Sequence, residues 1–177
     1  AGTVSLVERS LASDGSHPDG LFLCMGGADT ARGVRDRECD RALELMEARG
    51  YAVMSHPWDP ALSLQPPVIA YLTGAADLRG AIDGLEYLPG ALADNITSFG
   101  AVPGNWFFEE EGESQTSILR FLRAGASATH GTSAEPLNGS FASAAVMVLY
   151  AEGRSLGDAY AVSLPYLRWM NVVVGDP

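Results

Sequence analysis

Ser98, His130 and Glu135 have the side-chain types of a nucleophile, a general base and a group that orients the base. Ser98 follows an apolar segment in "ITSFG", and His130 ends the apolar run "ASATH", where Gly131 permits a sharp turn. A serine hydroxyl reacts only if a base lies within hydrogen-bond reach and donors face the developing oxyanion. The pattern is therefore consistent with a hydrolase site, or with a turn serine beside a structural histidine.

Asp94 and Glu135 form a second combination, because paired carboxylates beside aromatic rings are typical of glycosidases. Trp106, Phe107 and Phe108 could line such a cleft, and the same cluster could instead anchor a loop on the sheet edge. A metal site would have to be assembled from loops around His130, since the histidines show neither HxxxH nor HxH spacing. We predict no metal and no cofactor.

The stretch "GGADTARG" lacks the glycine order of a phosphate loop, has no lysine and carries an aspartate where an anion would sit. We therefore expect a flexible loop there, not a nucleotide site.

Short apolar runs bounded by glycine or proline predict buried strands over 21–25, 51–55, 68–73, 126–130 and 171–174. Between the first two, Asp36 is predicted to cap a helix that ends at Gly50. Together these elements form a β-α-β unit.

Further helices are predicted from an opening serine and a closing glycine or proline, over 114–125, 140–153 and 155–165. The stretch "VERSLASDG" suits a covering helix before the first strand. Strands alternating with helices predict one domain over 1–177, an α/β fold with a mostly parallel sheet and helices on both faces.

All 11 cations are arginine, against 22 acidic residues and a net charge of -11. This balance argues against nucleic acid and anionic membranes as partners. No apolar run approaches the roughly 20 residues of a membrane span, so we expect no transmembrane segment. Cys24 and Cys39 are either ordinary buried thiols or a single disulfide bridge.

Three ordered blocks carry a family resemblance: "LPGALADNITSFGAV", "QTSILRFLRAGASATHGTSAEP" and "SLGDAYAVSLPYLRWMNVVVGDP". With "HPDGLFLCMGGADTARG" and "VIAYLTGAADLRG" upstream, the chain from about His17 resembles an uncharacterised bacterial family found in genomes with the exosortase protein-sorting system. Members usually have a further N-terminal segment, which implies that this sequence is the C-terminal portion of a longer precursor.

That family is distantly similar to gingipain-type and caspase-like cysteine peptidases, which implies a caspase-like, Rossmann-type α/β/α sandwich. In such peptidases a histidine follows one strand and the nucleophilic cysteine follows the next. Here the matching positions hold Ala75 in "YLTGAADL" and Ser98 in "ADNITSFG". Loss of both members of a thiolate–imidazole pair argues against a caspase-type mechanism.

A set of family-like polar residues survives: Asp94, Asn95, Thr97, Ser98, Gln115, His130, Thr132, Glu135 and Pro136. Of these, Asn95, Thr97, Gln115 and Thr132 are candidate binding residues, together with Trp106.

The resemblance implies a catalytically degenerate peptidase-like domain that is exported to the periplasm or cell surface and binds a protein or peptide. One alternative is an active peptidase or transpeptidase that uses Ser98, His130 and Glu135 or a site including Asp94. The other is a structural subunit of a larger extracytoplasmic assembly.

Overall fold

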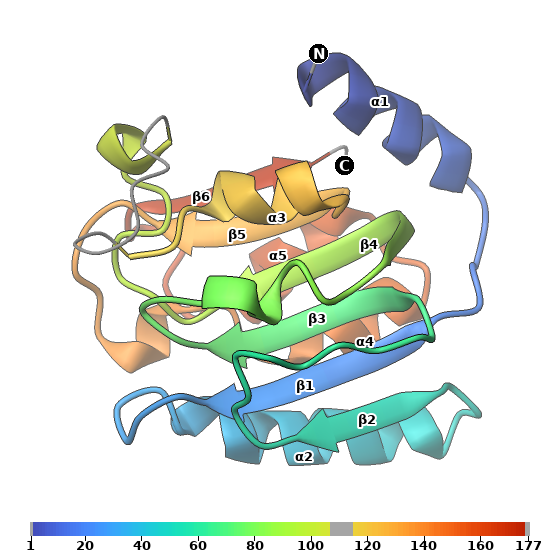
Figure 1. Ribbon diagram of the computed structural model, residues 1–177, viewed down its shortest axis with the longest axis horizontal. Helices are drawn as coiled ribbons and strands as arrows, with labels where there is room; N and C mark the ends of the chain where they lie inside the picture. Colours follow the sequence, from blue (N-terminus) through green and yellow to red (C-terminus); the bar gives the residue numbers. More distant parts are fainter. Residues whose placement is uncertain (1, 107–114, 176–177) are drawn as a thin grey trace.

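A six-stranded sheet lies at the centre of the computed structural model, which describes residues 2–106 and 115–175 (Figure 1). Its strand order is β2-β1-β3-β4-β5-β6. The first five are parallel to one another, and β6 pairs antiparallel with β5. The strands are β1 (Leu21–Gly27), β2 (Val53–His56), β3 (Val68–Gly74), β4 (Tyr87–Asn95), β5 (Ala128–Thr132) and β6 (Asn171–Gly175).

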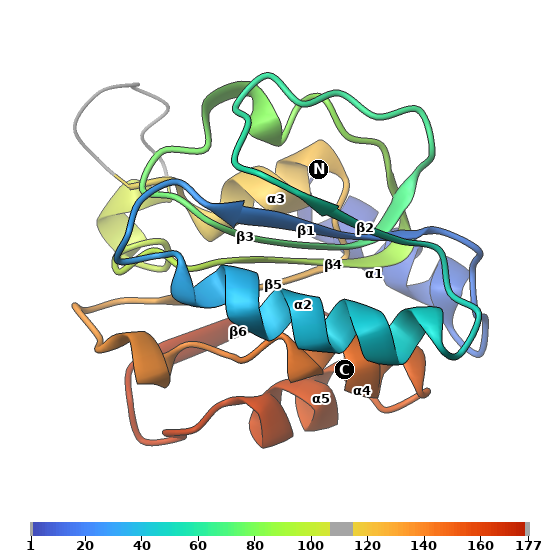
Figure 2. The same ribbon diagram turned by 90° about the horizontal axis from the view of Figure 1, so that it is seen from below.

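Helices cover both faces of the sheet (Figure 2). One face carries α1 (Gly2–Ser13) and α3 (Ile118–Ala124), and the other carries α2 (Val34–Glu47), α4 (Ala145–Ala151) and α5 (Leu156–Ser163). Because both faces are covered, the central strands are apolar without alternation, and β3 is buried along its whole length. The predicted α/β fold with three layers and a mostly parallel sheet is confirmed.

Strand β4 was not among the predicted strands, and the sequence of this strand contains a turn signal at Pro89 and Gly90. The dipeptide lies in a bulge of β4, where the register with β3 shifts between Val68 and Ala70. Gly90 has a φ of 86°, and its N–H and C=O bond to the side chains of Ser127 and Tyr150 at 2.9 and 2.7 Å. Side chains thus replace the ladder bonds that the bulge interrupts.

The strand that contains His130 runs from Ala128 to Thr132, not from 126 to 130 as predicted. Its end is extended because antiparallel β6 pairs along it as far as Thr132 opposite Asn171. His130 therefore lies inside the sheet, between β4 and β6, and not in the loop beyond it.

Two predicted helix caps are wrong. Helix α2 begins after Gly33, and the Oδ1 atom of Asp36 instead accepts the N–H of Gly27 at 2.8 Å, which ties the helix to the end of β1. Helix α4 begins only at Ala145, and Ser140 ends a 3₁₀ turn before it.

The other predicted caps fare differently. Ser155 caps α5 by accepting the N–H of Asp158 at 3.2 Å, and the helix ends before Pro165, as expected. Ser114 lies outside the described residues, and α3 is capped by Ser117. The predicted covering helix at the start of the chain is present as α1.

Cys24 on β1 and Cys39 on α2 form a disulfide, so the bridged alternative is the one found. Both residues are buried, with 1% and 2% of their surface exposed. The bridge fixes α2 on the face of the sheet that also receives α4 and α5. Among the described helices, none is long and apolar enough to cross a membrane.

Candidate functional site

Ser98 and Glu135 meet at the carboxyl edge of the sheet, where the Ser98 hydroxyl donates to Oε1 of Glu135 at 2.8 Å. Ser98 follows the end of β4 and Glu135 follows the end of β5, so two neighbouring parallel strands deliver the pair to one edge. Ser98 is 8% exposed and Glu135 is exposed. The structure therefore brings these two of the three candidate catalytic residues together.

His130 is separated from that pair by its own hydrogen bonds. Its Nδ1 lies 3.0 Å from Oδ2 of Asp94, and its Nε2 lies 2.9 Å from Oδ1 of Asn171. Both ring nitrogens are thus engaged by these two side chains. No nitrogen is left to take a proton from Ser98, and the described residues show no hydrogen bond between His130 and Ser98.

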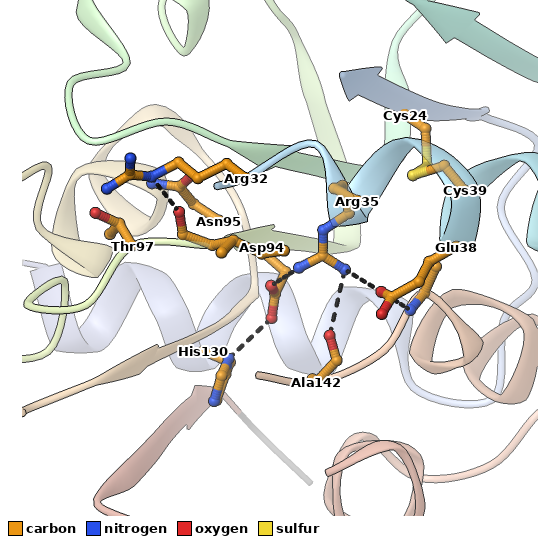
Figure 3. Close-up of polar contacts among 12 residues, drawn as sticks. Cys24, Arg32, Arg35, Glu38, Cys39, Asp94, Asn95, Thr97, His130 and Ala142 are labelled. Atoms are coloured by element: carbon orange, nitrogen blue, oxygen red, sulfur yellow. Dashed lines mark hydrogen bonds and ion pairs between the residues drawn. A yellow bond between two sulfur atoms is a disulfide. The ribbon is translucent and has the colours of Figure 1, made fainter. Parts of the chain in front are cut away.

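Asp94 is the centre of a buried network beneath the sheet (Figure 3). Besides His130, its carboxylate accepts from Nη2 of Arg35 at 2.7 Å and from the hydroxyl of Tyr160 at 3.3 Å. Arg35, Asp94 and His130 are each fully buried. The group joins α2, β4, β5 and α5, so it ties the sheet to the helical layer on that face.

The charges in this network shift two pKa values. Burial by itself would raise the pKa of Asp94, but His130 and Arg35 outweigh it and hold that pKa below its ordinary value. For Tyr160, burial and then the adjacent Asp94 carboxylate raise the pKa well above the usual value. The arrangement thus keeps an ionised carboxylate and a neutral phenol in the protein interior.

Arg35 and Tyr160 were not selected from the sequence. Arg35 had a detectable signal, because it precedes Cys39 by one helical turn and so lies on the apolar stripe of α2. A cation on such a stripe requires a buried acidic partner. Its guanidinium also donates to the carbonyl of Ala142 at 3.3 Å and lies 3.7 Å from a Glu38 oxygen.

Asn95 clamps the backbone that follows β3. Its Oδ1 accepts the N–H of Ala75 at 2.8 Å, and its Nδ2 donates to the carbonyl of Ala75 at 2.9 Å. Both residues are buried, at 2% and 1% exposure. The two-point bond ties the end of β4 to the segment after β3, so Asn95 is a structural link and is not open to a ligand.

The remaining candidate binding residues also bond within the protein. Gln115 accepts through Oε1 from the Thr97 hydroxyl at 2.5 Å and from the Phe99 N–H at 2.8 Å. The Thr132 hydroxyl donates to the carbonyl of Ser98 at 2.6 Å. These side chains fix the loops of the carboxyl edge around Ser98.

Trp106 is half-buried at the end of a 3₁₀ turn, and its carbonyl accepts from Arg123 at 3.3 Å. The predicted aromatic neighbours Phe107 and Phe108 lie outside the described residues. The expected cleft between these rings therefore stays a prediction.

The loop "GGADTARG" folds over the ends of β1 and β3. A Cβ atom on Gly27 would lie 2.4 Å from the carbonyl carbon of Arg32, so glycine is required for this approach. Arg32 donates through Nε to the carbonyl of Ile96 at 3.1 Å and pairs with Asp29. Although burial acts in the opposite direction, bonds from Arg32 lower the pKa of Asp29. The loop binds its own arginine and braces the carboxyl edge.

Comparison of the chain with protein-family models, curated proteins and solved structures gave no significant match. Within 2–106 and 115–175, no three histidine, cysteine or acidic side chains are grouped so that they could hold a metal ion. The functional argument therefore rests on the geometry of the carboxyl edge.

Proposed function

We propose that the protein is a catalytically degenerate peptidase-like domain with a caspase-like fold, which acts by binding or assembly at the bacterial cell envelope. The observation that carries this proposal is the clamp between Asn95 and Ala75. In the resembled peptidases the segments after these two strands supply the catalytic histidine and cysteine. Here the same segments are joined by a buried amide, which supplies neither a nucleophile nor a base.

The bonding of His130 supports the same conclusion. Its ring is fully buried and both of its nitrogens are engaged by Asp94 and Asn171, which argues against its acting as a base at the edge. The polar side chains around Ser98 bond to loops of the same edge. Such an edge is a rigid scaffold on which a partner can dock.

An exposed apolar segment between α5 and β6 supports a binding role. It contains Tyr166, Leu167, Trp169 and Met170, which are 61%, 66%, 38% and 52% exposed. The segment leads into Asn171, which pairs with the last residue of β5 and so lies at the carboxyl edge. Exposed apolar residues gathered in one short segment are typical of protein interaction sites, and we propose a protein partner here.

The disulfide supports the envelope as the location. Cysteine pairs persist in oxidising compartments such as the periplasm or the cell surface, and cytosolic thiols are normally kept reduced. The bridge between Cys24 and Cys39 is the feature of the structure that favours export.

A second candidate function is an active hydrolase, favoured by the hydrogen bond between Ser98 and Glu135. In this reading the carboxylate would take the hydroxyl proton as Ser98 attacks a carbonyl. Asp94 and His130 would then act only as the buried support of the edge. A carboxylate is a weak base for a serine hydroxyl, so this function is the less favoured.

The deciding experiment is hydrolysis of a diverse peptide library by the purified protein, with Ser98→Ala and Glu135→Gln alongside it and Ser133→Ala as the control. We expect no turnover by any of them. Cleavage that is lost in Ser98→Ala and Glu135→Gln and kept in Ser133→Ala would establish the hydrolase and overturn the proposal.

The binding role is tested by crosslinking in cell envelopes with Leu167→Glu. Val4→Glu is the matched control, because Val4 is similarly exposed, at 62%, but lies on α1. We expect a specific crosslinked protein in the wild type and the control and its loss in Leu167→Glu. An identical pattern in all three would contradict docking at the segment 166–170.

A further inference from the structure

A hollow of about 1050 Å³ opens at the amino edge of the sheet, opposite the edge discussed above. Its outer wall is the end of α1 and the segment 14–20 that follows it. The other walls are the starts of β1 and β5, the bulge at Gly90 and the turn between α4 and α5. In Figure 1 this is the side on which α1 and its connection to β1 run.

The outer wall is held in place by specific contacts. Nη2 of Arg9 donates to the carbonyls of Leu122 and Ala126, both at 3.0 Å. Leu122 belongs to the last turn of α3, where carbonyls lack partners within the helix and favour a cation. Farther along α1, Ser13 packs so closely on Gly90 that a Cβ there would lie 2.8 Å from it. The hollow is therefore a feature of the fold with a fixed wall.

Aromatic rings form the apolar part of the lining. The rings of Phe22 and Tyr51 pack edge to face with their centres 5.3 Å apart. The hydroxyl of Tyr51 donates to the carbonyl of Ala151 at 2.9 Å, and that of Tyr150 donates to the carbonyl of Gly90 at 2.7 Å. Because these bonds fix the rings, they offer a pre-organised surface to an apolar group.

The charged residues of the lining are predominantly acidic. Asp14 and Asp19 flank His17 on the segment 14–20, and Arg154 lies on the facing turn. None of these four side chains forms a hydrogen bond or ion pair with any residue that the structure describes. The lining thus holds two carboxylates and one guanidinium, so the rim attracts a positive group, and the net charge of -11 acts in the same direction.

We propose that this hollow binds an organic cation with an apolar body, an alkyl or aryl ammonium or guanidinium. The rings of Phe22, Tyr51 and Tyr150 receive the body and stabilise the positive group through their faces. Asp14 and Asp19 pair with the cation. The same chemistry is offered by a free amine and by a basic residue of a peptide. The site does not depend on the function proposed for the carboxyl edge.

The test is a titration followed by NMR amide shifts, with 2-phenylethylamine as the probe. Its neutral and anionic counterparts, 2-phenylethanol and 3-phenylpropanoate, share the body and differ in charge. We expect the amine to bind tightest and to shift amides of 14–20, 51 and 150–155. Asp14→Asn combined with Asp19→Asn should weaken it about fivefold or more, whereas Asp40→Asn, an exposed acid on α2, should not.

A second variant tests the location without altering charge. Ser16 is exposed on the segment 14–20, so Ser16→Trp should fill the hollow and abolish binding while the fold is kept. An acetylated Phe-Lys amide distinguishes the sources, since tighter binding of the amide indicates a peptide and tighter binding of the free amine a small molecule. Equal affinity for the amine, the alcohol and the carboxylate would overturn the proposal. So would an unchanged affinity for the amine in both Ser16→Trp and the variant that combines Asp14→Asn with Asp19→Asn.

Discussion

Replacement of Asp94 by asparagine should destabilise the protein strongly, because it removes the anion from a fully buried ion pair. The carboxylate accepts from Arg35 at 2.7 Å, from His130 at 3.0 Å and from Tyr160 at 3.3 Å. Without it, the partners of the Arg35 guanidinium among the described residues are the Ala142 carbonyl and a Glu38 oxygen 3.7 Å away. Removing one partner of a buried pair costs about 3–5 kcal/mol, since the other charge stays buried.

The same substitution should change the pH dependence of stability. The pKa of Asp94 is lowered in the folded protein, so its carboxylate stabilises the fold fully above the pKa of the unfolded chain. As the pH falls below about 4, the unfolded chain binds the proton first, and stability declines until the pH lies below the folded pKa. The Asn variant lacks this group, so its loss of stability in acid should be shallower.

The assay is equilibrium unfolding in denaturant at pH 7 and at steps down to pH 3. Asp83→Asn is the matched control, because Asp83 forms a 3.1 Å pair with Arg120 in which the two side chains are 65% and 32% exposed. An exposed pair contributes at most about 1 kcal/mol. If Asp94→Asn lost no more than this control, or kept the wild-type acid profile, the reasoning about the buried network would be refuted.

Two further substitutions test the disulfide and the hydrogen bonds between Asn95 and Ala75. Cys39→Ser should lower the free energy of unfolding by about 3 kcal/mol, because the bridge joins residues separated by 15 positions. Wild-type protein unfolded with a dithiol should match the variant, and an unchanged midpoint would contradict the bridge. Asn95→Ala leaves both backbone groups of Ala75 buried without partners and should cost about 2–4 kcal/mol. Faster hydrogen exchange at the Ala75 amide checks this, and Asn105→Ala, on a partly exposed loop residue, is the control.

The layered α/β architecture could be predicted because apolar runs and helical stripes repeat along the chain. Strand β4 could not, since Pro89 and Gly90 suggest a turn, and the hydrogen-bond partners of Gly90 in the strand are the side chains of Ser127 and Tyr150. Those partners come from distant parts of the sequence. Prediction from neighbouring residues cannot identify hydrogen-bond partners that are so distant in the sequence.

The candidate site was predictable in composition but not in connectivity. Ser98 and Glu135 follow neighbouring strands, so their meeting at one edge follows from parallel pairing. His130 has the right residue type, but its partner is decided by register, which places it directly opposite Asp94 on β4. One further residue of shift would have turned its ring to the other face of the sheet.

The burial of the Cys24–Cys39 bridge has a consequence for the order of events in oxidative folding. An oxidant or a reductant must reach a sulfur atom directly, and both cysteines are almost completely covered in the folded protein. We therefore expect the two thiols to be oxidised while the first β-α-β unit is still open, before closure of the core shields the bond. In the folded protein the oxidation state of these two cysteines therefore reflects the redox conditions during folding and not those met later.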